Sequence, residues 1–350
     1  MALEVATPKL NPRRLQVAYD LLREGVECGE LPVGLLAVAD RRETLRCEAY
    51  GPEGSIGTDG VYLIASITKP IVATAVMQLV EQGRVLIEDT VANYIPEFGV
   101  NGKAGVRLWH LLTHTSGMAD DDWEQRDVQP TAEMVLQGAL QSCLRFPPGS
   151  RFEYCNGAFC VLGELIRRAS GLSHQQYLRE HVFGPAGMPD TSFRLGPEKR
   201  ARLLPVRNFP EMPGGIDAFA AMELPAGGLF STAADLVSFG QAWLNGGVGK
   251  YGRVLSTAAL RVMTDLHTQG IVEHKNGDKV PAHWGLGWEK AVPQEGRLVT
   301  PAGYGHGGMT GTYLWIEPEI GLVVVFLTNR VGLDGRRRKA VVNAVMAALE

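Results

Sequence analysis

The chain has 350 residues, of which 45% are hydrophobic and 21% charged, and its formal net charge at pH 7 is −4. These values exclude a disordered, collagen-like or low-complexity chain, and the length suffices for one large domain or two intergrown ones. The only tight basic run, residues 336–339, is typical of a solvated helix face. We expect no nucleic-acid partner, because nucleic-acid-binding surfaces carry a broader basic patch.

The cysteines and the apolar segments give expectations about location. The number of cysteines is odd and no pair has metal-ligand spacing; they are Cys28, Cys47, Cys143, Cys155 and Cys160. A reduced setting fits this pattern best. No apolar run approaches the ~18 residues of a membrane helix, and the first ten residues lack the apolar core of a signal peptide. We expect a cytoplasmic protein with neither a cleaved signal nor a membrane partner.

The N-terminal part of the sequence predicts a helix, a hairpin and a second helix. An Asn-Pro pair at residues 11–12 indicates a helix start, since asparagine can cap a helix and proline suits its first position. Residues 32–39 and 44–50 are predicted to form two strands joined by a short turn. Residues 67–82 repeat apolar positions at helical spacing, and Gly83 is a natural end for that helix.

The middle of the chain, residues 84–225, is predicted to consist mostly of helices and loops. Helical periodicity is clearest near 131–142, 157–170 and 173–182. Ser231 and Thr232 are placed to cap a further helix that ends at Asn245. The last part of the sequence predicts strands at Leu286–Trp288, Gly311–Ile316 and Leu322–Leu327 and a closing helix at 337–349.

Sheet-forming segments therefore lie at both ends of the chain, with helices between them. Strands joined by short turns, rather than by helices, indicate an antiparallel sheet. The predicted fold class is α/β of the α+β type: one antiparallel sheet built from both termini and flanked by helices, plus an inserted, mostly helical domain. We place the sheet domain at residues 1–66 and 225–350 and the helical domain at residues 67–224.

The first motif that can carry chemistry is Ser66-Ile67-Thr68-Lys69-Pro70. Serine and lysine three positions apart on a helix lie on one face, and a lysine whose pKa is lowered by burial can take the serine proton. Proline is tolerated only near a helix start, which places the pair in the first turn, where the helix dipole stabilises a developing anion. The alternative is a surface Ser-x-x-Lys without function.

The second motif is Tyr154-Cys155-Asn156, which follows a Pro-Pro-Gly loop and precedes a predicted helix. A phenol beside an ammonium group can relay a proton, and the Asn156 amide can hold both a lysine and a polar group of a substrate. The alternative is an asparagine that caps the helix, beside a tyrosine that packs in the core.

The third motif is a glycine-rich segment just before a predicted strand, which contains His306, Gly307, Gly308 and Met309. Glycines at a strand edge let a ligand or another backbone come close. The backbone N–H groups of Ser66 and Met309 are candidates for the two donors of an oxyanion hole. The alternative is a glycine-rich bulge that binds no ligand.

In residue type and order, these three motifs resemble the signature elements of the serine β-lactamase and penicillin-binding-protein superfamily: Ser-x-x-Lys, Tyr-x-Asn and a Lys/His-x-Gly strand element. Further similarity lies in residues 108–117, 146–156 and 227–236. The resemblance spans roughly residues 30 to 330. It is closest to the class C β-lactamase-like branch and its esterases, the family VIII carboxylesterases.

The resemblance implies a β-lactamase/transpeptidase-like fold with its active site in the cleft between the two domains. It implies that Ser66 is the acylated residue and that Lys69 with Tyr154 supplies base and acid. Asn156 would position Lys69 and the acyl group, and His306 would line the far wall. The implied mechanism is acyl transfer to the serine followed by attack of water on the acyl-enzyme, with no cofactor and no metal.

One position departs from the β-lactamase and peptidase pattern. Their third element usually begins with lysine, a fixed cation that helps to anchor a substrate carboxylate, whereas this chain has His306, which is expected to be largely neutral at pH 7. We therefore expect a carboxylesterase for short acyl chains, with a small-molecule ester or amide as substrate. A D-amino-acid amidase or peptidase, a weak β-lactamase, an acyltransferase with the same nucleophile and a non-catalytic binding protein on the same fold remain alternatives.

Two other pairs of residues have both a functional and a structural explanation. His110 and His114 have the i, i+4 spacing of a zinc helix but lack the glutamate after the first histidine, so structural histidines are favoured. Trp284 and Trp288 can line a pocket or fill the core, and the core is favoured.

Overall fold

The computed structural model of the chain describes residues 8–120, 131–211, 214–275, 277–292 and 296–350. Within these ranges, the main sheet has seven strands in the order β3-β2-β1-β11-β10-β9-β8, and neighbouring strands are antiparallel. They are β1 (Gly34–Ala39), β2 (Thr44–Gly51), β3 (Gly54–Ile56), β8 (Glu289–Lys290), β9 (Tyr304–Gly307), β10 (Tyr313–Glu317) and β11 (Leu322–Leu327). Two smaller pairs join β4 (Tyr62–Leu63) to β5 (Phe230–Ser231) and β6 (Val272–Lys275) to β7 (Asp278–Pro281). The predicted antiparallel sheet built from both ends of the chain is confirmed.

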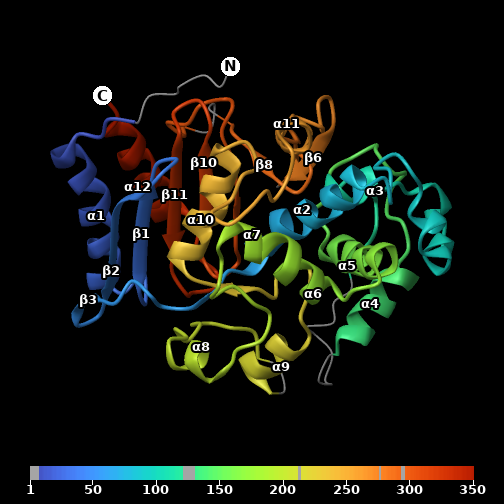
Figure 1. Cartoon of the computed structure of the whole chain (residues 1–350), viewed down its shortest axis with the longest axis horizontal. Coiled ribbons are helices and arrows are strands. Elements are labelled where there is room, and N and C mark those ends of the chain that lie inside the picture. The colour runs from blue at the N-terminus through green and yellow to red at the C-terminus, as the bar shows by residue number, and fades with distance from the viewer. Residues whose placement is uncertain (1–7, 121–130, 212–213, 276, 293–295) are drawn as a thin grey trace.

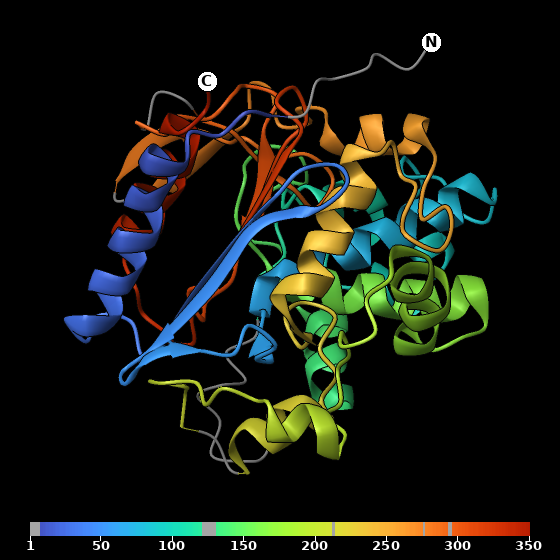
Figure 2. The same ribbon diagram turned by 60° about the vertical axis from the view of Figure 1, so that its left-hand side comes forward.

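Helices cover both faces of this sheet (Figures 1 and 2). α1 (Pro12–Glu27) and α12 (Arg336–Ala347) pack together on one face, and α10 (Ala233–Leu244) packs on the other against β1, β10 and β11. Because both faces are covered, strands β1 and β11 are buried along their whole length and are apolar without alternation. Their register, with Leu35 opposite Leu327, joins the two ends of the chain in the middle of the sheet.

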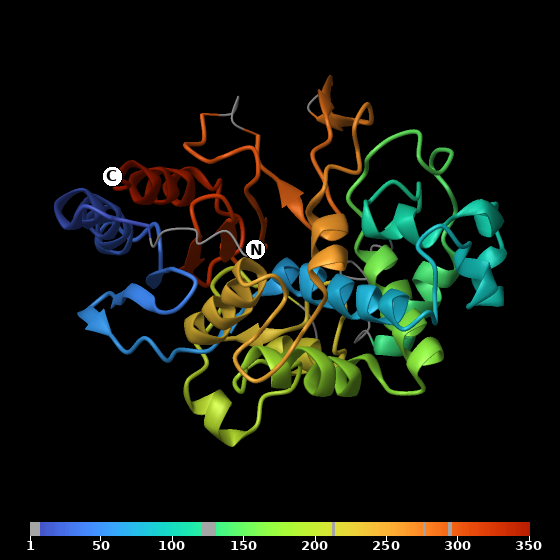
Figure 3. The ribbon, with the colours of Figure 1, turned by 45° about the horizontal axis from the view of Figure 1, so that its top comes forward.

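Helix α2 (Thr68–Glu81) lies between the sheet and the helical part of the molecule (Figure 3). It is buried on nearly all sides, so its apolar residues form no single stripe, and it packs against α5 (Asn156–Ser170), α6 (His174–Leu178) and α11 (Thr257–Thr264). The other α-helices are α3 (Leu108–Leu112), α4 (Ala132–Gln141), α7 (Gly184–Ala186), α8 (Pro197–Ala201) and α9 (Gly215–Ala221). Single 3₁₀ turns occur at Ala65–Ile67, Val91–Asn93, Pro96–Gly99 and Lys103–Gly105, and a π-helical turn at Arg179–Phe183. The predicted helices are confirmed, whereas the predicted division into two domains with a cleft between them stays a prediction.

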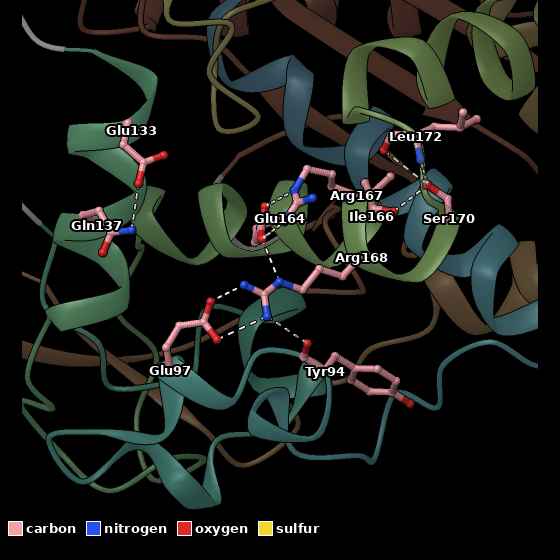
Figure 4. A network of polar contacts seen from close by, with 10 residues as sticks. All are labelled: Tyr94, Glu97, Glu133, Gln137, Glu164, Ile166, Arg167, Arg168, Ser170 and Leu172. Atoms are coloured by element: carbon pink, nitrogen blue, oxygen red, sulfur yellow. Dashed lines mark hydrogen bonds and ion pairs between the residues drawn. The ribbon is translucent and has the colours of Figure 1, made fainter.

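The C-terminal end of α5 is fixed by a network of charged side chains (Figure 4). The nearly buried Glu164 carboxylate accepts hydrogen bonds from Arg167 and Arg168, each at 2.7 Å. Arg168 also pairs with Glu97 of a 3₁₀ turn. A nearly buried carboxylate shared by two guanidinium groups is held more firmly than an exposed ion pair. The network therefore anchors the C-terminal end of α5. At the other end, Asn156, the first residue of the helix, contacts Lys69.

One predicted strand is wrong. Leu286–Trp288 forms a buried bend, and strand β8 begins only at Glu289. Gly287 has a φ of +77°, which lies outside the strand region, and it packs directly on α2. The segment is apolar because it fills the core, where Trp288 is fully buried. The glycine-rich segment expected just before a strand also begins within one, since Tyr304–Gly307 forms β9.

Three further properties concern location and bound ions. None of the helices in the described ranges has the length and hydropathy needed to cross a bilayer. All five cysteines are free thiols. Among the residues that the structure describes, no group of three or more His, Cys, Asp or Glu side chains could hold a metal ion.

Candidate active site

Ser66 and Lys69 meet at the start of α2, as their spacing predicts. Ser66 lies in the 3₁₀ turn that leads into the helix, and Lys69 is the second residue of the helix. The Lys69 Nζ atom is 3.2 Å from Ser66 Oγ. Ala65, directly before the serine, has a φ of +46°, which is uncommon for a residue with a side chain and is a form of strain that clusters at functional sites. A strained turn thus presents the serine to a buried lysine.

The Lys69 side chain is fully buried, and burial lowers its pKa to about 7. Besides Ser66 Oγ, its Nζ lies 2.8 Å from Asn156 Oδ1 and 2.6 Å from the carbonyl oxygen of Ala226. A neutral amine has two N–H donors and one lone pair. When the amine is neutral and its two donors are bonded to Asn156 and Ala226, its lone pair is left to accept from the Ser66 hydroxyl; when it is protonated, Nζ donates to Ser66 Oγ instead. The neutral form suits proton abstraction.

Tyr154 completes the group around the serine. Its ring lies over Lys69 Nζ, with 4.6 Å between the nitrogen and the ring centroid. Burial raises the pKa of the phenol, and the nearby Ser66 hydroxyl opposes this rise only in part. Tyr154 is therefore a proton donor at neutral pH while Lys69 titrates there, so the two groups can divide the acid and base roles.

Asp120, a carboxylate that the sequence reasoning missed, orients Asn156. It accepts hydrogen bonds from the Asn156 backbone N–H at 2.8 Å and from the side-chain amide at 3.2 Å. It also accepts from the Gly157 N–H at 2.8 Å and the Cys155 thiol at 3.0 Å, and so caps α5 from outside the helix. With its amide nitrogen bonded to Asp120, Asn156 presents its oxygen to Lys69. No local spacing indicates this contact, because it joins residues 36 positions apart.

The glycine-rich segment after β9 is hydrogen-bonded to the residues that lead into the turn of Ser66. The hydroxyls of Thr310 and Thr312 donate to the carbonyl oxygens of Leu63 and Ile64, at 2.7 and 3.1 Å. Gly308 leaves no room for a side chain, because a Cβ there would lie 2.5 Å from the Ile64 oxygen and 2.2 Å from Thr312 Oγ1. Only glycine lets the two segments approach this closely.

This packing brings the segment of Met309 beside that of Ser66, the arrangement that an oxyanion hole requires. The Met309 side chain is 43% exposed, and its backbone N–H and that of Ser66 remain the proposed donors. Gly307, by contrast, faces the other side of the sheet. It pairs with Tyr313, and a Cβ on it would lie 2.9 Å from Arg338 Nη1 on α12. Gly307 therefore does not face Ser66.

His306 extends from β9 toward Tyr154 and Trp284, with ring centroids 6.2 and 5.4 Å apart, respectively. Its Nδ1 donates to the Gly307 carbonyl oxygen at 2.7 Å, which leaves the lone pair on Nε2. Burial, together with the charge of Lys69, lowers the pKa of His306 to about 3. The histidine is therefore neutral at pH 7, as the sequence led us to expect.

In each of the two remaining residue pairs, the tryptophans and the histidines, one residue lies beside the site and the other lies away from it. Trp284 is half-buried beside the site, whereas Trp288 is fully buried. The prediction that both tryptophans fill the core is therefore correct for Trp288 alone. His114 is buried against the site, whereas His110 lies in α3 and its Nδ1 accepts from the Arg107 N–H at 2.9 Å. Sequence spacing alone does not separate the two histidines.

Comparison with known proteins gives matches over most of the chain. The family model described as Beta-lactamase matches residues 19–347. Penicillin-binding protein 4 of Amycolatopsis lactamdurans is 30% identical over 301 residues, which cover 79% of this chain and 74% of that protein. The D-alanyl-D-alanine-carboxypeptidase/endopeptidase AmpH of Escherichia coli (strain K12) is 31% identical over 281 residues, covering 76% and 71%. The crystal structure of a family VIII carboxylesterase has a TM-score of 0.80 at 20% identity, covering 97% of this chain and 99% of that one, and this likeness shows the fold.

Proposed function

The chain belongs to the β-lactamase family of serine hydrolases, and we propose that it is a carboxylesterase that cleaves esters of short acyl chains through an acyl-enzyme on Ser66. The observation that carries the proposal is the buried Lys69 amine, whose Nζ lies within hydrogen-bonding distance of Asn156 Oδ1, the Ala226 carbonyl oxygen and Ser66 Oγ. The proposed substrate is a small molecule, and no cofactor takes part in the steps below.

The proposed reaction has two acyl transfers. Ser66 attacks the ester carbonyl while Lys69 takes its proton, and the N–H groups of Ser66 and Met309 stabilise the oxyanion. Tyr154 donates its proton to the departing alcohol and regains one from the lysine ammonium. Water then attacks the acyl-enzyme, and the same groups remove its proton and return one to the serine oxygen. The start of α2 adds the positive end of its dipole to the site.

The neutral His306 supports an ester over an anionic substrate. A β-lactam or a D-alanyl peptide carries a carboxylate, and a neutral imidazole gives it no fixed cation at this position. The family VIII carboxylesterase among the structural neighbours points the same way. A D-alanyl carboxypeptidase is the second candidate, because a sequence relative at 31% identity has that name.

A substrate panel tests these candidates against each other. We expect turnover of p-nitrophenyl acetate and butyrate, much slower turnover of nitrocefin and of a D-alanyl anilide, and an acyl adduct on the peptide that contains Ser66. Anilide or nitrocefin turnover without ester turnover would replace the proposal with a peptidase or a β-lactamase. No turnover and no adduct would leave a binding protein on the same fold.

We also propose that the protein works in a reducing compartment, the cytoplasm. The five free cysteines support this, since oxidising compartments favour disulfides. Two of them, Cys155 and Cys160, are buried.

Ester turnover is expected to rise with pH through about 7. The neutral Lys69 amine is the active base and its pKa is about 7, so kcat/KM should increase from about pH 5.5 to 8 and then level off. Because burial raises the pKa of Tyr154, no decline is expected at moderately alkaline pH. Steady-state kinetics at constant ionic strength measure the profile. A fall in kcat/KM between pH 6 and 8 would be incompatible with a lysine base.

Asp120→Asn is expected to lower both stability and turnover. The helix loses an N-terminal carboxylate, which should reduce the free energy of unfolding by about 1–2 kcal/mol. Turnover should fall because Asn156 loses its fixed orientation toward Lys69. Urea unfolding and ester kinetics measure the two effects, with Asp217→Asn, an exposed carboxylate in the first turn of α9, as the control. If the two variants behave alike, Asp120 has no such role.

A further inference from the structure

His114 has an unusual backbone and a fully buried side chain. Its φ is +57°, in the left-handed region that residues with side chains rarely adopt. The side chain has no exposed surface. Strain of this kind persists only where the surroundings hold a residue in place, and it concentrates at functional sites.

The contacts of His114 enclose Tyr154 of the second motif and the residue on either side of it. Its carbonyl oxygen accepts from the Glu153 N–H at 2.9 Å, and its Nδ1 accepts from the Cys155 N–H at 3.1 Å. Between these two bonds, its ring stacks on the Tyr154 ring, with centroids 4.3 Å apart and planes at 22°. One residue therefore holds the backbone on both sides of Tyr154 and also one face of its ring.

The protonation state of His114 follows from these bonds. Because Nδ1 accepts, the proton lies on Nε2, and that N–H has no hydrogen-bond partner among the described residues. Burial, together with the nearby charge of Lys69, holds the pKa of His114 well below its usual range, so the ring stays neutral.

The surroundings of His114 restrict which residue can replace it. Its ring is surrounded by aromatic side chains, including those of Phe152, Phe159 and Trp284. A phenylalanine would fill that space but would leave the buried Cys155 N–H without its acceptor, and a glycine would relieve the backbone strain but remove the ring. The histidine is the residue that combines a stacking ring with an acceptor at the Nδ1 position.

We propose that His114 is a positioning residue for the reaction: it clamps residues 153–155 so that the Tyr154 hydroxyl stays at Ser66 through both acyl transfers. This inference rests on the proposed function, since it assigns His114 a role through Tyr154. The histidine itself does not touch the reacting atoms.

Two substitutions separate the parts of the clamp. His114→Asn keeps an acceptor near the Nδ1 position and tolerates the left-handed backbone, but removes the ring. His114→Phe keeps the ring and removes the acceptor. His110→Asn is the matched control, because the His110 side chain bonds locally, to the N-cap residue of its own helix. We expect kcat to fall about 10- to 100-fold in His114→Asn and less in His114→Phe, with KM within about twofold and the control unchanged.

The pH profile and a double-mutant cycle distinguish positioning from general support of the fold. Loosening the contact exposes the phenol to water and lets the pKa of Tyr154 fall, so His114→Asn should show an alkaline decline in kcat/KM that the wild type lacks. In a Tyr154→Phe background, adding His114→Asn should cost no further activity. An equal loss in both backgrounds, or a wild-type pH profile, would overturn the inference.

The design also separates failure of this inference from failure of the proposed function. Wild-type ester turnover and the Ser66 adduct are measured first, and their absence refutes the function whatever the variants do. If both are present and the cycle is additive, only the role of His114 is refuted. Should His114→Asn not fold, as judged by thermal unfolding, the same cycle is carried out with His114→Phe.

Discussion

Ser66→Ala is expected to abolish ester turnover, with a loss in kcat on the order of 10⁴–10⁶. Alanine cannot form the acyl-enzyme, so both transfers are lost together, while Lys69, Tyr154 and the proposed oxyanion donors stay in place. Only the weak acceleration of direct water attack by those groups should remain. The measurement is p-nitrophenyl butyrate hydrolysis together with the mass of the protein after a rapid quench.

Two controls make this result specific. Ser238→Ala, on α10, should retain turnover and the acyl adduct, because that serine belongs to the helix that covers the sheet. Thermal unfolding of Ser66→Ala should match that of the wild type, since the serine is only half-buried and its loss leaves no large cavity. Substantial turnover by a folded Ser66→Ala variant would disprove the nucleophile assignment.

Lys69→Met is expected to lower kcat by about 10²–10⁴ with little change in KM, because it removes the base and keeps the shape of the side chain. The same change has a consequence for stability. The lysine carries its ordinary pKa in the unfolded chain and about 7 in the folded one, so below pH 7 folding must bury an ammonium group or release its proton.

The pH dependence of that stability difference has a definite sign. The unfolded state binds more protons than the folded state between about pH 7 and the ordinary lysine pKa, so wild-type stability gains from this group as pH rises. The advantage of Lys69→Met over the wild type should therefore be largest below about pH 7 and shrink toward pH 10. Urea unfolding of both proteins at several pH values measures it. A difference that does not change with pH would mean that the lysine is not desolvated as described.

The parts of the site that the sequence predicted are those with short-range geometry. Ser66 and Lys69 lie one helical turn apart, so their meeting follows from helix spacing and the proline after them. The contact between Asn156 and Lys69, by contrast, joins distant segments of the chain. Only the resemblance to a known protein family predicted this contact from the sequence.

The parts that the sequence did not predict depend on contacts between distant segments. Asp120 acts on residues far along the chain, and the threonines after β9 reach back to the residues before Ser66. The wrong strand at Leu286–Trp288 has a related cause. An apolar run shows that a segment is buried, but a positive φ at Gly287 and its packing on α2 decide that the segment bends.

The pairing of β1 with β11 also sets the order in which a newly made chain can mature on the ribosome. β1 is apolar on both faces and needs β11, which is synthesised near the end of translation. Until then, β1 can pair with β2 on one edge only, and its other edge stays open to the aggregation that chaperones would need to prevent. The turn that holds the serine likewise lacks its threonine anchors until that late stage. An incomplete polypeptide is therefore expected to lack the arrangement of Ser66 that the proposed reaction needs.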